Sequence, residues 1–449
     1  MNHKLARLFL LLTLVLSACA PTVTTPSPSA PISPTDTSIP SAYTSSPPTS
    51  TEILTQESTG IARPFPQHVT YAPGSILPNH RSQTQLDDDV RTFYNVWKQT
   101  YLLEAGTSED GHPLYRIAFG KSAPNHDQTV SEGQGFGMVI MPIMAGYDTD
   151  AQNLFDGLWE FARTHPSEVD SRLMDWKVPD SIDGNDSAFD GDADMALGLL
   201  LADAQWGSTG HINYKAEAET LLSGILESTI GPESRLPMLG DWVDASGTDF
   251  NQYTPRSSDF MLANFRAFGN ATGDPVWDEI NVNSQAVMLS IQQNYSPTSG
   301  LMPDFIVMTG DNHIPQPAPP DFLEGADDGH YSYNAGRIPW RVGADALLNN
   351  DATSRAIAQK ISLWVESAAN GDPTNIKAGY DLDGNPLPDS DYFTTFFVAP
   401  MGVAAMTNPD QLEWLNAVYD SVYDQHQDYY EDSVTLLCLL VMTGNFWTP

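Results

Sequence analysis

The sequence predicts an all-α domain built as a closed double ring of paired helices. From about residue 63 to residue 449, apolar residues recur at helical spacing far more often than they alternate, and long β-branched runs are scarce. About a dozen helices joined by loops follow, a number that suits an inner ring covered by an outer one. We expect them near residues 87–103, 131–146, 150–164, 190–205, 212–229, 256–268, 276–294, 333–348, 352–369, 391–406, 410–425 and 431–443.

The first 18 residues have the layout of a secretory signal. Lys4 and Arg7 precede an apolar stretch that is too short to span a bilayer. The ending LSAC (16–19) resembles a bacterial lipobox, which implies cleavage before Cys19 and lipidation of its thiol. An ordinary signal peptide that ends near a cysteine is the alternative. The resemblance predicts an exported lipoprotein, held at the cell surface or outer membrane through Cys19.

Residues 19–61 are dominated by Pro, Ser and Thr and carry almost no large apolar side chains. Such a segment cannot bury enough surface to offset the entropy lost on ordering. We interpret it as an extended tether. Residues 62–449 then form the folded domain.

The chain is strongly acidic, with 20 Lys and Arg against 57 Asp and Glu among 449 residues and a formal net charge of -37. Nearly all of this charge lies after the tether. It disfavours nucleic acid as a partner. A solubilising surface and attraction of a cationic substrate both explain it. The two cysteines, Cys19 and Cys438, provide no disulfide framework, and Cys438 lies in an apolar run typical of a core.

Long loops rich in Gly, Pro, Asp and Asn interrupt the helices at 165–187, 230–255 and 296–332. Loops of this length in a compact domain usually line a site or have no fixed structure.

Glu132 is the first candidate catalytic residue. It lies near the start of an expected helix in the run SEGQGFGM (131–138). Glycines are poor helix formers, so their crowding into a first turn suggests the close approach of a ligand or of another backbone. The alternative is an ordinary acidic residue that favours a helix N-terminus, with Ser131 as its cap.

A second acidic cluster, AFDGDAD (188–194), opens the next apolar helix and contains Asp190 and Asp192. These acids also fit the helix dipole. We discount a calcium loop of the EF-hand type, because the helix begins where that loop would place its later ligands.

Together the two stretches resemble glycoside hydrolase family 8. Residues 131–138 are similar to that family's Ser-Glu-Gly-Gln-Gly-Tyr-Gly-Met, with Phe136 in place of the tyrosine, and residues 190–206 resemble its second signature. Phe189 and Gly198 depart from that signature, which puts the detail of the pocket in question. The resemblance implies that Glu132 is the general acid and that Asp190 holds and distorts the sugar beside the scissile bond, with Asp192 in the same region.

In the best-known cellulase members of this family the base is an aspartate in a Tyr-Asp-Ala-x-Arg motif, but here YNAGR (333–337) carries Asn334. An amide cannot accept a proton at neutral pH. The stretch DFLEGADD (321–328) in the preceding loop resembles a second branch of the family, which contains chitosanases, lichenases and some endoglucanases. In that branch the loop glutamate is the base. This assigns Glu324, with three aspartates of the same loop as alternatives: Asp321, Asp327 and Asp328.

The resemblance implies inversion at the anomeric carbon, so the carboxyl groups of Glu132 and Glu324 should stand roughly 6.5–9.5 Å apart with a water between them. Glu132 needs a raised pKa, which burial and a neighbouring carboxylate such as Asp190 can supply. We expect substrate contacts from aromatic and polar side chains of the loops. They are Asp192, Asn334, Arg337, Tyr333, Trp176 and Trp242. Tyr253 and Tyr331 are further aromatic candidates, and the stretch 256–261 also matches the family near its cleft, although we assign it no role.

These residues predict an (α/α)6 barrel that hydrolyses a β-1,4-linked polysaccharide internally, as a monomer and with no metal or organic cofactor in its chemistry. β-Glucan is slightly favoured over chitosan as the substrate. A surface lipoprotein that binds oligosaccharides without cleaving them is the rival from another class. Asn334 favours that rival, whereas the pair of Glu132 and Glu324 argues against it.

Overall fold

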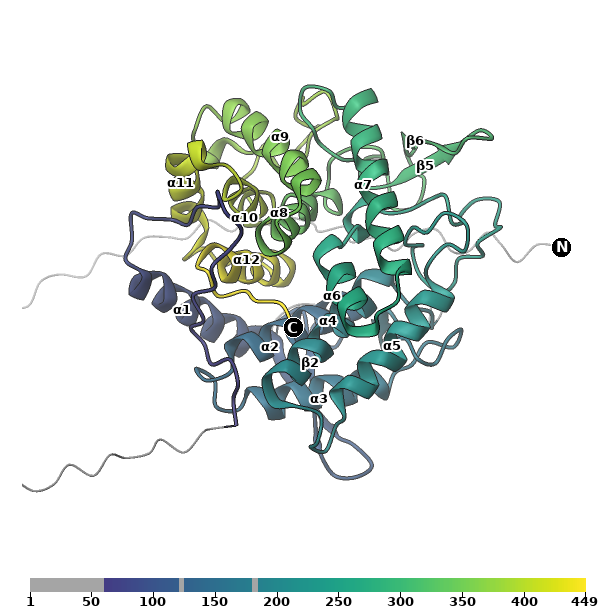
Figure 1. Ribbon diagram of the computed structural model, residues 1–449, viewed down its shortest axis with the longest axis vertical. Coiled ribbons are helices and arrows are strands. Elements are labelled where there is room, and N and C mark those ends of the chain that lie inside the picture. Colours follow the sequence, from purple (N-terminus) through teal and green to yellow (C-terminus); the bar gives the residue numbers. More distant parts are fainter. Residues whose placement is uncertain (1–59, 121–124, 180–184) are drawn as a thin grey trace, which may run out of the picture. The chain divides into compact units, whose positions relative to one another are not determined.

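The computed structural model describes residues 60–120, 125–179 and 185–449. The predicted signal peptide, Cys19 and all of the predicted tether except its last two residues lie outside the described residues. Within the described ranges, twelve α-helices form an inner and an outer ring, which is the predicted (α/α)6 barrel (Figure 1).

The inner ring is closed by contacts from each helix to the next and from the last back to the first. Its helices are α2 (Ser131–Met144), α4 (Phe189–Trp206), α6 (Leu262–Thr272), α8 (Ile338–Asn349), α10 (Thr395–Ala405) and α12 (Tyr429–Met442). All eleven residues of α10 are buried, and α2, α4 and α12 are buried almost all round. A helix that is apolar on every side belongs in the middle of a protein, which explains this placement.

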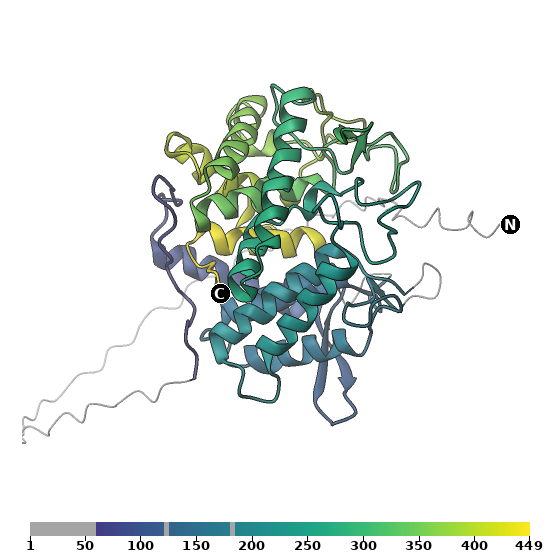
Figure 2. The ribbon, with the colours of Figure 1, turned by 45° about the vertical axis from the view of Figure 1, so that its right-hand side comes forward.

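Each outer helix packs against the inner ring and buries one face. The outer helices are α1 (Gln83–Tyr101), α3 (Ala151–Arg163), α5 (Tyr214–Ser228), α7 (Val276–Asn294), α9 (Ala352–Ala368) and α11 (Leu412–Val422). Three of them start with a side chain that caps free backbone N–H groups. Ser82 and Gln85 form a capping box at α1, and Asn213 and Asp351 cap α5 and α9. Figure 2 shows the layers from a second side.

Short two-stranded antiparallel sheets lie in the segments that connect the helices, and the sequence analysis did not predict them. They pair β1 (Leu102–Thr107) with β2 (Pro113–Ile117), β3 (Thr129–Val130) with β4 (Lys177–Val178), and β5 (Ile306–Thr309) with β6 (Ile314–Pro317). Strands of two to six residues leave too few alternating positions to be read from a pattern. The helices expected near 256–268 and 333–348 also begin later, because 3-10 turns at Ser257–Asp259 and Ala335–Arg337 precede α6 and α8.

The glycines of α2 and α4 let these two helices touch. A Cβ on Gly135 would lie 2.9 Å from the Gly191 carbonyl oxygen, and a Cβ on Gly191 would lie 2.5 Å from the Ser131 carbonyl carbon. The sequence analysis explained such glycines by the close approach of either a ligand or another backbone. At these positions the structure shows the close approach of another backbone. The contact fixes the first turns of α2 and α4 side by side.

We expect Gly191→Ala to destabilise the fold by about 1–3 kcal/mol, because the new methyl group overlaps the backbone of α2 and the helices must move apart. The midpoint of urea unfolding measures this change. Gly210→Ala is the matched control, since a Cβ there has no atom within 4 Å. Equal midpoints for the two variants would show that the contact between α2 and α4 is not tight.

The segment before α1 crosses the carboxyl ends of three inner helices. Backbone N–H groups of Ala62, Phe65 and Val69 donate to the carbonyl oxygens of Gln205, Ala145 and Gly444, at 3.1, 2.7 and 2.6 Å. These acceptors lie at the ends of α4, α2 and α12, whereas Glu132 and Asp190 lie in the first turns of α2 and α4. The chain therefore enters the domain at the end of the ring opposite those acids. No helix in the described ranges combines the length and apolarity needed to cross a membrane.

Candidate active site

Glu132 lies in the first turn of α2 with its side chain 17% exposed. Its Oε2 accepts a hydrogen bond from Arg337 Nη1 at 2.6 Å, and its Oε1 accepts one from the Tyr429 hydroxyl at 3.3 Å. Burial raises the pKa of Glu132 to about 7; Arg337 opposes this rise and Asp190 adds to it. A carboxyl group with a pKa near 7 is protonated in a large fraction of molecules at neutral pH and can donate that proton, as a general acid must.

Asp190 begins α4 beside Glu132 and behaves in the opposite way. Its Oδ2 lies 2.7 Å from Arg337 Nη1 and 2.9 Å from Arg256 Nη2. Burial acts to raise the pKa of Asp190, but the two guanidinium groups outweigh it and hold the pKa below its ordinary value. The site thus keeps one carboxyl ionised next to another that is poised to carry a proton.

Arg337 connects these acids to the opposite side of the site. It is 1% exposed, and its Nη2 donates to the Ser258 hydroxyl at 2.8 Å and to Asn334 Oδ1 at 3.1 Å. The amide of Asn334 then donates through Nδ2 to Glu324 Oε2 at 2.8 Å. A chain of three hydrogen bonds therefore runs from Glu132 to Glu324 through Arg337 and Asn334.

Glu324 comes from the long loop after β6 and is exposed to solvent. Surrounding protein still desolvates its carboxyl group and raises its pKa, and Arg256 and Asn334 oppose the rise. Asp328 shapes the loop, because its carboxylate accepts hydrogen bonds from the backbone N–H groups of Leu323, Glu324 and Gly325 at 2.7–3.0 Å. This turn presents the Glu324 carboxylate where water can reach it.

The other two alternatives to Glu324 differ from it in their contacts. Asp327 is exposed and lies 3.3 Å from His330, and Asp321 is exposed at the start of the turn. Among the three aspartates of this loop, Asp328 is buried and occupied by backbone donors. The hydrogen bond to Asn334 thus distinguishes Glu324 within its loop.

The structure places Asp192 away from Asp190. Residues two apart on a helix point to opposite sides, and Asp192 is fully buried with its Oδ1 accepting from the Met174 N–H at 3.0 Å. Burial raises its pKa well above the ordinary value. Asp192 therefore hydrogen-bonds to the loop at Met174, whereas the sequence analysis expected it to contact the substrate.

The expected aromatic residues lie on several loops around the helix ends. Trp176 is partly exposed, and its carbonyl oxygen accepts from the Ser131 N–H at the start of α2. Trp242 packs edge-on against Phe250, with ring centroids 5.3 Å apart, in a small core beneath the loops. Tyr333 is 36% exposed and shares a hydrogen bond with the Tyr392 hydroxyl at 2.8 Å.

Sequence reasoning assigned no role to three charged residues of this site, although two of them lie in the stretch 256–261 that matches the family. Arg256 pairs with both Asp190 and Asp259, and burial raises the pKa of Asp259 to about 7. Asp304 accepts from the backbone N–H groups of Ser332 and Ala335, and burial raises its pKa to about 7 as well. The three-residue spacing of Arg256 and Asp259 is a usable signal for their pairing, whereas nothing near Asp304 in the sequence links it to Asn334.

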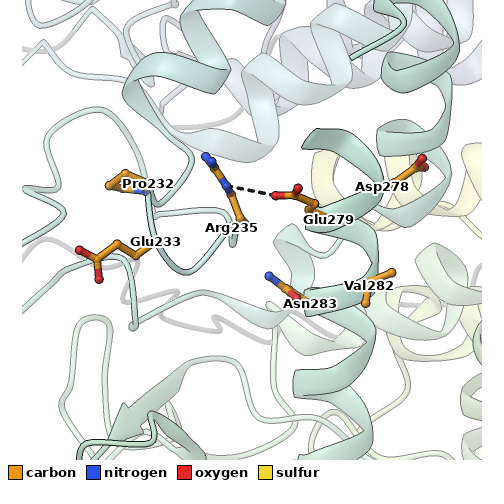
Figure 3. A pocket seen from close by; sticks show the side chains of 7 residues that line it. All are labelled: Pro232, Glu233, Arg235, Asp278, Glu279, Val282 and Asn283. Atoms are coloured by element: carbon orange, nitrogen blue, oxygen red, sulfur yellow. Dashed lines mark ion pairs between the residues drawn. The ribbon is translucent and has the colours of Figure 1, made fainter. Parts of the chain in front are cut away.

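A surface pocket of about 570 Å³ lies elsewhere, between α7 and the loop after α5 (Figure 3). Its lining residues are Pro232, Glu233, Arg235, Asp278, Glu279, Val282 and Asn283. Arg235 forms an ion pair with Glu279 at 3.3 Å across it. The pocket contains no residue that the sequence analysis assigned to the site.

We expect Asn334→Asp to lower kcat/KM about tenfold or more. The substitution removes the donor to Glu324 and adds an anion beside Glu324 and Asp304, which raises the pKa of the base further. Because the base must be deprotonated, the acidic limb of the pH profile moves to higher pH. The matched control is Asn349→Asp, since the Asn349 amide also donates to a carboxylate, Asp345 Oδ1, at 3.0 Å. A rise in kcat/KM for Asn334→Asp would indicate that the side chain at position 334, and not Glu324, acts as the general base.

An (α/α)6 ring that holds an ionised carboxyl group next to a carboxyl group with a raised pKa has the acidic groups that a glycoside hydrolase requires. The chain belongs to the family described as Glycosyl hydrolases family 8, whose model matches residues 82–444.

Relatives and solved structures agree with this family over most of the chain. A "Beta-glucanase" of Niallia circulans is 41% identical over 390 residues, which cover 86% of this chain and 91% of the relative. An "Endoglucanase" of Bacillus sp. (strain KSM-330) is 39% identical and covers 86% and 82% of the two chains. The apo structure of a beta-1,3-1,4-glucanase from Paenibacillus sp. X4 matches with a TM-score of 0.81 and 40% identity, and covers 86% of this chain and 100% of that one.

Proposed function

We propose that the protein is an endo-acting β-glucanase that inverts the anomeric carbon, with Glu132 as general acid and Glu324 as general base. The observation that carries the assignment is the hydrogen-bonded chain from Glu132 through Arg337 and Asn334 to Glu324. It connects the two glutamates through the buried Arg337 and through Asn334, with no direct hydrogen bond between them. An inverting site needs room for a sugar ring and a water between its two carboxyl groups.

The roles follow from the charges. Glu132 gives its proton to the leaving oxygen, while Glu324 takes a proton from the water that attacks from the other face of the ring. Asp190, ionised between Arg256 and Arg337, holds the sugar beside the scissile bond and stabilises positive charge as it develops there. The substrate class rests on the relatives named β-glucanase and endoglucanase.

The decisive experiment incubates the purified protein with mixed-linkage β-glucan, carboxymethyl cellulose and chitosan and measures new reducing ends. We expect hydrolysis of a β-glucan, a rapid fall in viscosity that marks internal cleavage, and α-anomeric first products by NMR. Hydrolysis of chitosan alone would favour a chitosanase whose acidic surface attracts this cationic polymer. Binding without reducing ends on all three polymers would favour the non-catalytic lipoprotein.

We further propose that the protein is exported and anchored through lipid on Cys19. The support is the sequence LSAC (16–19), which ends the predicted signal peptide and resembles a lipobox. Metabolic labelling of the expressing cell with an alkyne fatty acid tests this. The parent protein should carry the label and Cys19→Ser should not. Equal labelling of the two would overturn the assignment of Cys19.

A further inference from the structure

Three ligand-type side chains meet on the outer layer of the barrel. His112 directly precedes β2, Glu160 lies on α3, and His211 lies between α4 and α5. One potential ligand atom from each lies within 4.8 Å of the other two. His211 Nε2 is 2.8 Å from Glu160 Oε1, and the two imidazole rings stack with centroids 4.1 Å apart. Residues from three separate parts of the chain therefore converge at one point.

The hydrogen bonds around Glu160 leave it incompletely satisfied. Its Oε2 is buried and, within the part of the chain that the structure describes, has no hydrogen-bond partner. A buried carboxylate oxygen without a partner costs about 1–3 kcal/mol or more. Since the side chain is 17% exposed while His211 beside it is 50% exposed, a small ligand can reach the carboxylate from the solvent side.

Asp156 adds a second negative charge one turn earlier on α3. The Tyr214 hydroxyl donates to its Oδ1 at 2.5 Å, which fixes the carboxylate against the start of α5. Both imidazoles are close enough to Asp156 to influence its ionisation. Two carboxylates on one helix thus face two imidazoles, a set of groups that attracts a cation.

We propose that His112, Glu160 and His211 bind one Zn²⁺ ion, with water in the fourth position. Two imidazoles and a carboxylate are preferred ligands of Zn²⁺, whereas Ca²⁺ and Mg²⁺ prefer six or more oxygens. Tetrahedral bonds of about 2.0–2.1 Å bring ligand atoms about 3.3 Å apart. Both histidines are exposed, and the proposal requires their rings to rotate until the ligand atoms reach that spacing.

The bound ion would join the β1–β2 turn, α3 and the turn between α4 and α5. Its effect is on stability, because a ligand that binds the folded chain alone raises its unfolding midpoint. The chemistry of hydrolysis is separate: His211 follows the carboxyl end of α4, and Asp190 lies at the other end of that helix, which is about 27 Å long.

Calorimetric titration with ZnCl₂ tests the proposal on chelator-treated protein that carries no histidine tag. We expect one equivalent to bind to the parent. His112→Ala and His211→Ala should each weaken binding by about tenfold or more. His80→Ala is the matched control, since it removes a histidine that also pairs with a carboxylate, Asp420, at 2.8 Å. Added Zn²⁺ should raise Tm for the parent and for His80→Ala, but not for the other two variants.

Two results would overturn the site: no binding of Zn²⁺ to the parent at millimolar concentration, or equal affinity in the parent and in His211→Ala. With Co²⁺ in place of Zn²⁺, the intense visible absorption of a tetrahedral complex should appear in the parent and disappear in Glu160→Gln. Its persistence in that variant would remove Glu160 from the site. His211→Ala should hydrolyse β-glucan at the parent rate, so failure of the metal site is distinguishable from failure of the proposed function.

Discussion

Glu132→Gln is expected to lower kcat/KM on polymeric β-glucan about 10³-fold, or about 4 kcal/mol of transition-state stabilisation. The amide keeps the shape of the side chain and removes the proton that the leaving oxygen needs. Loss of the proton donor should matter little when the leaving group departs unaided. The variant should therefore approach the parent rate on a β-cellobioside with a dinitrophenolate leaving group, as measured by phenolate absorbance.

The pH profile gives an independent check of the same residue. With a pKa of about 7, Glu132 carries its proton below pH 7 and loses it above. The kcat/KM of the parent should fall as the pH rises through about 7, and this fall should be absent in Glu132→Gln because an amide does not titrate. Glu413→Gln, an exposed glutamate in the first turn of α11, is the matched control and should behave as the parent. Parent-like activity of Glu132→Gln on polymer would exclude Glu132 as the acid.

Glu324→Ala is expected to have an effect of similar size, about 10³-fold on kcat/KM, because no group remains to take the proton of the attacking water. The shortened side chain also leaves space for a small anion. Azide needs no deprotonation, so its addition should restore turnover and yield a glycosyl azide of α configuration from a β-linked oligosaccharide. NMR of the product identifies both the azide and its anomeric configuration.

Asp327→Ala is the matched control for the base, since Asp327 lies three residues away in the same loop and is exposed. It should retain full activity and gain nothing from azide. If Asp327→Ala instead lost activity and recovered it with azide, the base would be Asp327. A β-configured azide from Glu324→Ala would contradict inversion.

The fold was readable from the sequence because each helix carries its own apolar pattern. The inner helix α10 is apolar throughout and the outer helix α1 is apolar on one face, and both patterns are typical of helices. Short strands were missed because they depend on a partner, as β1 depends on β2. The 3-10 turn before α8 was absorbed into the expected helix, since Ala335 and Gly336 continue its apolar character.

The site was only partly readable. The motifs around Glu132 and Asp190 marked both residues, and the resemblance to the family pointed to Glu324, but the charges that tune them come from distant segments. Arg256 meets Asp190 from 66 positions along the chain, within 2.9 Å. Asp192 shows the converse: it belongs to the motif, yet helical geometry turns it into the protein interior. Contacts of this kind arise from tertiary packing and leave no pattern in one sequence.

The crossing of the N-terminal segment over the carboxyl ends of α2, α4 and α12 has a consequence for access to long polymers. Residues 62–69 lie at the end of the ring remote from Glu132 and Asp190. A glucan chain can therefore approach and leave the two acids without passing this segment. Changes to residues 62–69 should leave the approach of a polymer open, whereas additions to the loop that carries Glu324 should obstruct it.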